Sequence, residues 1–200
     1  MRIQFLPGGG RFFYGRRKET SLLKEGQTRI PSGCAIAAMI STRGDLMTGE
    51  KIVESMIPMH DRSNGLGGGF AGYGIYPAYR EFYAFHVFFD DHDAKSACEK
   101  YLKEGFEIVK SEDIPIIKVP QITDVPIVWR YFLAPMSSVL SRLQLDEKEF
   151  VARSVMKINS QFRGAYVFSS GKNMGCFKAV GFPEDVGRFY RLEEYRGYSW

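Results

Sequence analysis

The sequence predicts an α+β protein. Residues 80–180 contain strand-like and helical segments in the order β-α-β-β-α-β, which is the order of a ferredoxin-like unit. Before them, residues 34–80 combine an apolar run, a helical stripe and a glycine-rich stretch of strand type. With 44% hydrophobic and 25% charged residues, a chain of 200 residues can bury a substantial core.

The first 33 residues predict a leader. They are rich in glycine and charge, and no hydrophobic period of 2 or 3.6 residues persists through them. We interpret residues 1–33 as a propeptide; the alternative is a surface arm that is never removed, since chain ends are often loosely held. We interpret the basic residues here as part of a solvated arm and not as a nucleic-acid patch: Arg11, Arg16, Arg17 and Lys18.

Residues 34–80 begin with a strand and a helix. The apolar run 34–40 predicts a buried strand, closed by the polar residues 41–45. Thr48 is a suitable N-cap for a following helix that stops near Pro58. One face of this helix is expected to pack on a sheet through residues at helical spacing: Ile52, Val53, Met56 and Ile57.

A glycine-rich segment follows the helix. Residues 67–72 (GGGFAG) match the dinucleotide-binding fingerprint, and Asp90-Asp91 follows at about the expected 20 residues. The context argues against nucleotide binding, because that motif requires a strand, a turn and a helix in this order. Here a helix precedes the motif and a strand-like stretch follows it. We therefore predict a strand whose glycines allow close approach of another backbone or a bound substrate.

Residues 80–180 supply the strands of the ferredoxin-like unit. Aromatic and β-branched residues predict strands at 82–89, from 107, at 127–133 and at 164–168.

Two amphipathic helices are expected between these strands. The first has Cys98 on its packing face and ends near Gly105, so Cys98 is predicted to be structural. The second begins at Asp146, which forms a capping-box-like start with Glu149, and packs through Val151, Val155 and Ile158.

The last part of the chain predicts a turn and a short helix. Cys176 lies in a hairpin-like stretch without a neighbouring base and is interpreted as a packing residue. A helix starting at Pro183 is expected to bury Val186, Phe189 and Tyr190.

Cys34 is the candidate catalytic residue. It follows Ser32-Gly33, and because Gly33 has no side chain over the Gly33–Cys34 peptide bond, a protease could reach that bond. Cleavage would give Cys34 a free α-amine, whose reference pKa of about 7.7–8.0 suits it to accept the thiol proton. One residue would then supply nucleophile and base. The alternative is that Cys34 is a small buried hydrophobe.

Two segments, residues 30–40 and 59–74, together resemble the class II glutamine amidotransferases, specifically the amidotransferase domain of glutamate synthase and its free-standing prokaryotic relatives. In that family a cysteine exposed by propeptide removal starts the first strand, a helix follows, and an arginine-containing turn leads into a glycine-rich strand. The same elements occur here in the same order and at similar separation.

The resemblance implies roles for several residues. Cys34 is the expected nucleophile, and Arg62 is expected to support its amine or thiolate. Gly67, Gly68 and Gly69 are expected to allow the backbone to approach the substrate closely. The alternative for Arg62 is an ion pair with Asp61 or another carboxylate.

The resemblance also implies a division of the chain. Residues 34–80 would form the N-terminal part of a partial αββα Ntn-hydrolase-like sandwich, and residues 80–180 an inserted ferredoxin-like subdomain. Residues 181–200 would return toward the rest of the amidotransferase domain. Two features depart from the family pattern: Ala35 stands where many members have glycine, and the family's later elements are missing. Those elements are an arginine-containing strand, an Asn-Gly oxyanion turn after Asn64-Gly65, and an aspartate for the substrate amine.

The implied function is that of a glutaminase whose ammonia passes to a synthase partner. The partners would be glutamine and either a synthase subunit or the remainder of the amidotransferase domain. No cofactor is expected in this chain, whereas flavin and an iron–sulfur cluster are possible on a partner synthase subunit. The alternative is a catalytically incomplete fragment or a non-catalytic binding or regulatory module, because one oxyanion donor is typically worth about 2.7–4 kcal/mol.

Composition argues against several other classes of function. The net charge of +4 is mild and its signs are interspersed, so dedicated nucleic-acid binding is not expected. There is no run of 18 apolar residues and thus no expected membrane span. Three cysteines at unrelated spacings fit a reducing cytosol, so a cytoplasmic protein is expected.

One cluster of histidine and aspartate residues could suggest a metal site. His86 and His92 flank Asp90, Asp91 and Asp93. A metal needs three or four convergent ligands, and His86 falls within a predicted strand. A solvated strand end is therefore the favoured interpretation.

Overall fold

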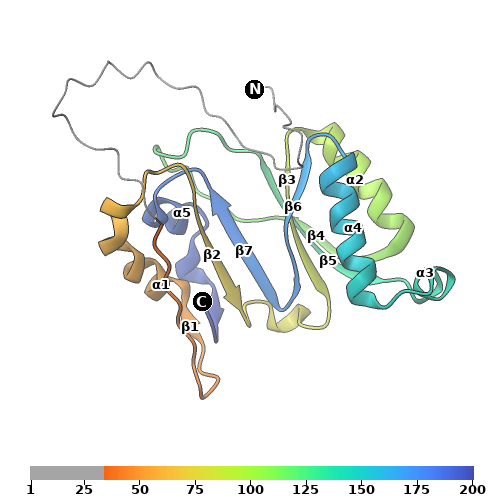
Figure 1. Ribbon diagram of the computed structural model, residues 1–200, viewed down its shortest axis with the longest axis horizontal. Helices are drawn as coiled ribbons and strands as arrows, with labels where there is room; N and C mark the ends of the chain where they lie inside the picture. Colours follow the sequence, from red (N-terminus) through yellow and green to blue (C-terminus); the bar gives the residue numbers. More distant parts are fainter. Residues whose placement is uncertain (1–33) are drawn as a thin grey trace.

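The computed structural model describes residues 34–200 of the chain (Figure 1). Among these residues every paired strand is antiparallel, and helices separate many of the strands along the chain. The α+β class predicted from the sequence is confirmed. The leader predicted for residues 1–33 lies outside the described residues.

A four-stranded sheet forms the centre of the molecule, in the spatial order β4-β5-β3-β6. Its strands, rich in aromatic and β-branched residues, are β3 (Tyr83–Phe89), β4 (Phe106–Asp113), β5 (Ile127–Pro135) and β6 (Ala165–Lys172). The helices between them are α2 (His92–Gly105), the short α3 (Ser137–Leu143) and α4 (Glu147–Gln161). The β-α-β-β-α-β order expected from the sequence is observed.

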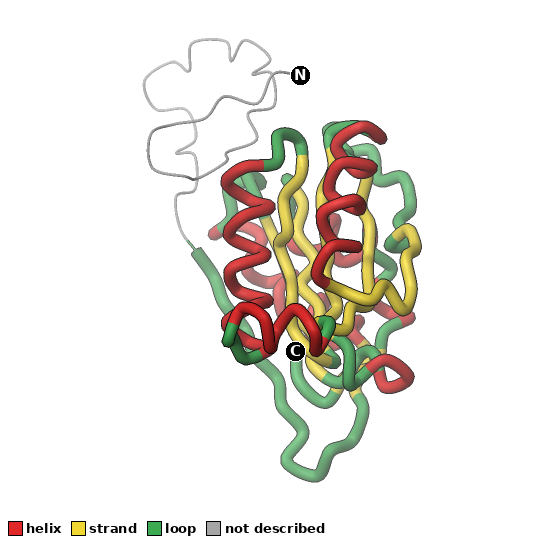
Figure 2. Tube along the Cα trace, turned by 90° about the vertical axis from the view of Figure 1, so that its right-hand side faces the viewer, coloured by secondary structure: helices red, strands yellow, loops and turns green. Residues whose placement is uncertain are grey.

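Helices α2 and α4 cover one face of this sheet (Figure 2). Both begin at an aspartate whose side chain accepts a backbone N–H: Asp91 from Ala94, and Asp146 from Glu149, as the capping pattern predicted. Their apolar stripes enter a core formed with the inward residues of the sheet. The largest fully buried members of this core are Phe85, Phe89, Leu102, Phe106, Tyr131, Leu133 and Ile158, and Cys98 is buried among them, as predicted.

The glycine-rich segment forms a second sheet with the chain after β6. Strand β2 (Gly68–Tyr73) pairs with β7 (Met174–Ala179), with Phe70 opposite Phe177. Backbone hydrogen bonds add two segments outside the named strands: Tyr73 bonds to residues 198 and 199, and Met39 exchanges two bonds of 2.8 Å with Trp200. The lateral order is therefore residues 39–41, residues 198–200, β2 and β7. Next to it, β1 (Met47–Thr48) pairs with β8 (Arg196–Gly197).

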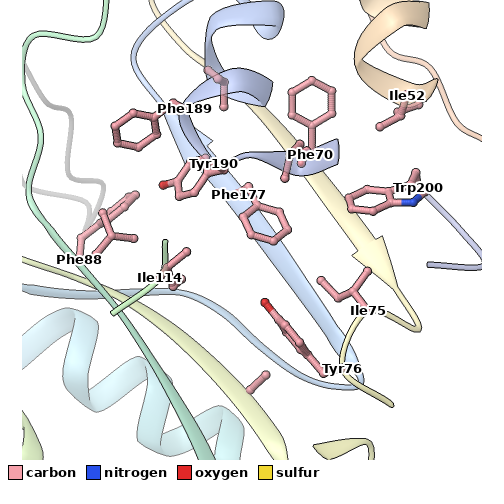
Figure 3. Close-up of a cluster of buried hydrophobic side chains, with 14 of the residues drawn as sticks. Ile52, Phe70, Ile75, Tyr76, Phe88, Ile114, Phe177, Phe189, Tyr190 and Trp200 are labelled. Atoms are coloured by element: carbon pink, nitrogen blue, oxygen red, sulfur yellow. The ribbon is translucent and has the colours of Figure 1, made fainter. Parts of the chain in front are cut away.

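Helices α1 (Gly49–Met56) and α5 (Pro183–Phe189) pack on this second sheet, on the other side of the four-stranded sheet from α2 and α4 (Figure 1). Short 3-10 helices complete the fold at Ile57–Arg62, Pro77–Tyr79 and Leu192–Glu194. The core shared by the two sheets and helices α1 and α5 contains Phe70, Phe177, Tyr190 and Trp200 (Figure 3). Val186, Phe189 and Tyr190 are buried as predicted.

Of two predicted boundaries, one is confirmed and one needs correction. The first α-helix has Thr48 as its N-cap and ends at Met56, close to Pro58, as predicted; the chain then continues as a separate 3-10 helix to Arg62. Pro58 is tolerated there because it stands in the first turn, where its missing N–H is not needed. The ferredoxin-like unit ends at Lys172 and not near residue 180, because the following strand β7 pairs with β2.

The prediction of a buried strand at residues 34–40 is wrong. Only Ile40 forms a β-bridge, to Ser199, and side chains along the segment alternate between exposed and half-buried. Among the described residues the segment pairs with the C-terminal residues 198–200, and the alternation shows that one of its faces is open. An apolar run forms a buried strand only where other elements cover both faces of that strand. Whether they do depends on distant parts of the chain, so the run itself does not predict it.

Candidate functional site

A cavity of about 630 Å³ lies at the end of the glycine-rich sheet. Its wall includes Cys34, the three glycines Gly67, Gly68 and Gly69, and one charged residue of each sign, Asp124 and Lys178. The rest of the lining comes from α1, the 3-10 helix and turn that follow it, helix α5, the loop before β5, and the strands β3, β5 and β6. The volume is in the range of sites for small molecules, about 300–1,000 Å³. The structure thus brings the predicted nucleophile and the predicted glycines to one site.

Neighbouring backbone crowds Gly68 and Gly69, whereas Gly67 has room for a Cβ. A Cβ at Gly69 would lie 2.9 Å from the carbonyl oxygen of Phe177 on the neighbouring strand. A Cβ at Gly68 would lie 3.3 Å from the carbonyl oxygen of Gly181 and from a methyl group of Val186. The close approach of another backbone predicted for this segment is therefore observed.

A tight turn leads from the 3-10 helix into this strand. The hydroxyl of Ser63 accepts the N–H of Gly65 at 3.2 Å, and the side-chain oxygen of Asn64 accepts the N–H of Leu66 at 3.1 Å. Gly65 has a φ of +68°, which favours glycine, and the ring of Phe182 lies close by. The side-chain oxygens of Ser63 and Asn64 are thus engaged by the turn itself, although both residues line the cavity.

Cys34 is exposed, and it is the one cysteine of the chain on the cavity wall. The alternative of a small buried hydrophobe therefore does not hold for Cys34. It holds for Cys98, where burial raises the pKa of the thiol to about 12. Cys176 is half-buried in β7 and its N–H donates to the hydroxyl of Ser169.

Arg62 does not lie in the cavity. It is exposed at the end of the 3-10 helix and is absent from the cavity wall. The structure therefore does not bring it together with Cys34 and the glycines.

Sequence reasoning missed a contact beside the site. The Nδ1 atom of His60 is hydrogen-bonded to a carboxylate oxygen of Glu184, and its ring stacks on Phe182 with centroids 4.0 Å apart. This contact joins the 3-10 helix to the start of α5, whose Pro183 lines the cavity. The partners are 124 residues apart in sequence, so no local pattern could have indicated it.

His86 lies neither at a solvated strand end nor in a metal site. It is fully buried on β3, which has a neighbouring strand on both sides. Its Nδ1–H donates to the carbonyl oxygen of Cys176 at 2.7 Å, so its Nε2 accepts the hydroxyl of Tyr76 at 2.9 Å. That hydroxyl in turn accepts from Arg130, which pairs with Glu112. Burial lowers the pKa of His86 to about 3, so its ring is neutral at ordinary pH.

The described residues hold no group of three or more His, Cys, Asp or Glu side chains placed to bind a metal ion. The dinucleotide fingerprint is also not in its required context, because residues 68–73 form the antiparallel strand β2 and no helix follows directly. Among residues 34–200, no helix is long and apolar enough to span a membrane.

Comparison with known proteins gives a relative without a known function. No protein-family model matches the chain. An uncharacterized protein of Archaeoglobus fulgidus is 44% identical to this chain over 170 residues, which cover 84% of this chain and 45% of that protein. The chain thus spans a little under half the length of this relative.

Proposed function

We propose that this chain is a glutamine amidotransferase (glutaminase) domain of the glutamate synthase type, with Cys34 as nucleophile. The observation that supports the proposal most is the position of Cys34: an exposed thiol that shares one cavity with Gly67, Gly68 and Gly69. Asp124 and Lys178 on the same wall match the ammonium and carboxylate groups of a free amino acid.

The proposed reaction begins with removal of residues 1–33, which frees the α-amine of Cys34. That amine takes the thiol proton, and the sulfur attacks the side-chain amide carbon of glutamine. The new C–S bond forms, the C–N bond breaks, and the proton passes to the leaving nitrogen to release ammonia. Water then attacks the thioester, the C–S bond breaks, and glutamate leaves as the thiol regains a proton.

The proposal includes the finer fold and the partners implied by the resemblance. The glycine-rich sheet with α1 and α5 would form one half of an αββα Ntn-hydrolase-like sandwich, and the ferredoxin-like unit would be its insertion. Ammonia would pass to a synthase subunit, and flavin or an iron–sulfur cluster would belong to that subunit. The open side of residues 34–40 supports a sandwich that these residues fill only in part.

The test combines intact mass with turnover. A preparation that releases ammonia from glutamine should begin at Cys34, and Cys34→Ala should abolish release, whereas Cys176→Ala, a cysteine outside the cavity, should retain it. Turnover by a chain that still carries residues 1–33, or by Cys34→Ala, would contradict the proposal.

A non-catalytic module is the second candidate. It is favoured by the position of Arg62 outside the cavity, which leaves Lys178 as the one cationic side chain that the described residues place on the cavity wall. Binding of glutamine without ammonia release, both in this chain and in its complex with the partner inferred below, would support this candidate.

A further inference from the structure

The pairing register of the glycine-rich sheet identifies the residues that lie on one of its two faces. Ile40 bridges Ser199, and Ser199 bridges Tyr73. Paired residues in antiparallel strands point to the same side, and alternate residues along each strand share that side. The face therefore contains Cys34, Ile36, Ala38 and Ile40, then Ser199, then Gly69, Ala71 and Tyr73, and finally Met174, Cys176 and Lys178. We call this set the outer face.

The opposite face of the same sheet is packed. Phe70, Phe177 and Trp200 point to that side and are buried in the core with α1 and α5 (Figure 3). Met39 and Ala37 also pack against this core. The sheet therefore has one covered face and one outer face, as half of a layered structure has.

The outer face is apolar and open. Ile36 is 92% exposed and Ile40 is 71% exposed, and Tyr73 is exposed beside them. On β7, Met174 and Cys176 are half-buried where Ser169 of β6 contacts them, whereas Lys178 is exposed. Of the residues on this face only Lys178 carries a charge. Burying apolar surface is worth roughly 25 cal/mol per Å², and contiguous exposed apolar patches typically mark interaction sites.

We infer that the outer face binds a polypeptide equivalent to the part of the Archaeoglobus relative that lies outside the matched segment. More than half of that relative lies outside it, since the match covers 45% of its length. A chain of that size can supply a further sheet, and two sheets pack face to face through apolar side chains about 10 Å apart. The apolar character of the outer face fits this kind of packing.

The same face places the partner next to the thiol. Cys34 lies on the same side of the extended segment as Ile36, Ala38 and Ile40. A polypeptide that covers these residues would therefore also reach the part of the cavity wall that Cys34 forms. If the proposed function holds, this partner would add polar donors at the Cys34 side of the cavity. The docking itself rests only on the register and exposure of the sheet.

The experiment uses the full chain, tagged and co-expressed with the Archaeoglobus polypeptide from which the matched segment has been removed. We expect a one-to-one complex by native mass and slower hydrogen exchange in residues 34–41 and β2. Ile40→Asp should weaken the complex at least tenfold. The matched control is Met156→Asp, because Met156 is 70% exposed but lies on α4, away from the outer face, and this variant should bind like the wild type.

Three outcomes would overturn the inference: no complex, equal binding by Ile40→Asp and the wild type, or self-association of the chain through the same face. Because Ile40 is exposed, Ile40→Asp should fold normally, which far-UV circular dichroism checks; Ile36→Asp provides a second variant. Cys34→Ala should form the complex even if it lacks turnover. Failure of docking and failure of the proposed chemistry are thus separable.

Discussion

The Nδ1 atom of His86 lies 2.7 Å from the carbonyl oxygen of Cys176. This bond joins β3, a central strand of the four-stranded sheet, to β7 of the glycine-rich sheet. Gly175 makes room for it, because a Cβ there would lie 2.9 Å from Nε2 of the same ring. One neutral histidine therefore helps to fix how the two sheets pack together.

The first prediction concerns removal of this ring. His86→Ala should lower the free energy of unfolding by about 2–5 kcal/mol, because it leaves a cavity and removes the partners of Tyr76 and the Cys176 carbonyl. Urea unfolding followed by circular dichroism measures the change. His92→Ala is the control: His92 is exposed on α2, and its loss should cost less than about 0.5 kcal/mol. Equal effects of the two variants would contradict the structural role of His86.

The second prediction concerns pH. Burial lowers the pKa of His86 to about 3 in the folded chain, against about 6.5 in an unfolded one. Between these values the unfolded chain binds a proton that the folded chain does not, so the contribution of His86 to stability is complete above pH ~6.5 and is lost as pH falls.

This contribution can be measured by comparison with His86→Gln, which has no titrating group at this position. From about pH 6 down to about pH 4 the wild type should lose up to roughly 1.4 kcal/mol per pH unit more than His86→Gln. Arg130, Glu112, Tyr76 and Tyr195 surround the network and are unchanged in both chains, so the difference in slope reports His86. Parallel pH profiles of the two chains would show that His86 is not the group responsible.

The third prediction concerns the contact between α1 and α5. A Cβ at Gly187 would overlap the side chain of Val53. Gly187→Ala should therefore destabilise the fold by about 1–3 kcal/mol through overpacking, although alanine normally favours a helix over glycine by about 1 kcal/mol. In a Val53→Ala background the same change should cost little or nothing. A thermodynamic cycle over the four chains measures the coupling, and additive effects would count against the crowding.

The fourth prediction concerns the thiols. Iodoacetamide should modify Cys34 first in the folded chain, because it is exposed, whereas Cys98 should stay unmodified, because it is buried and its pKa is raised to about 12. Peptide mass spectrometry after a timed reaction gives the order. In a strong denaturant all three cysteines should react, and this sample is the control. Early modification of Cys98 would mean that the α2 face of the core opens easily.

Local patterns predicted the parts of the fold that depend on local physics. The stripes of α2 and α4 and the cap at Asp146 need only side chains within a few residues, and they were predicted correctly. The burial of His86 and the exposure of residues 34–40 depend on which strands pair across the chain, and no local pattern contains that information. For the site, Cys34 and the glycines could be chosen from the sequence, whereas the contact of His60 with Glu184 and the presence of Asp124 and Lys178 in the cavity could not.

The ends of the ferredoxin-like unit meet at Asn173. Its carbonyl oxygen accepts the N–H of Gly74 at 2.7 Å, and its side-chain oxygen accepts the N–H of Tyr76 at 2.9 Å. Tyr73 and Met174, the residues at which the chain leaves and re-enters the glycine-rich sheet, are directly paired. The whole unit thus connects two strands, β2 and β7, that pair directly with each other. This unit contributes to the core that holds Phe70 and Phe177, through Phe88, Ile114, Val128 and Phe132. Removing the unit would therefore expose apolar side chains of β2 and β7 to water. Because the two sheets share this core, we expect them to unfold in a single transition.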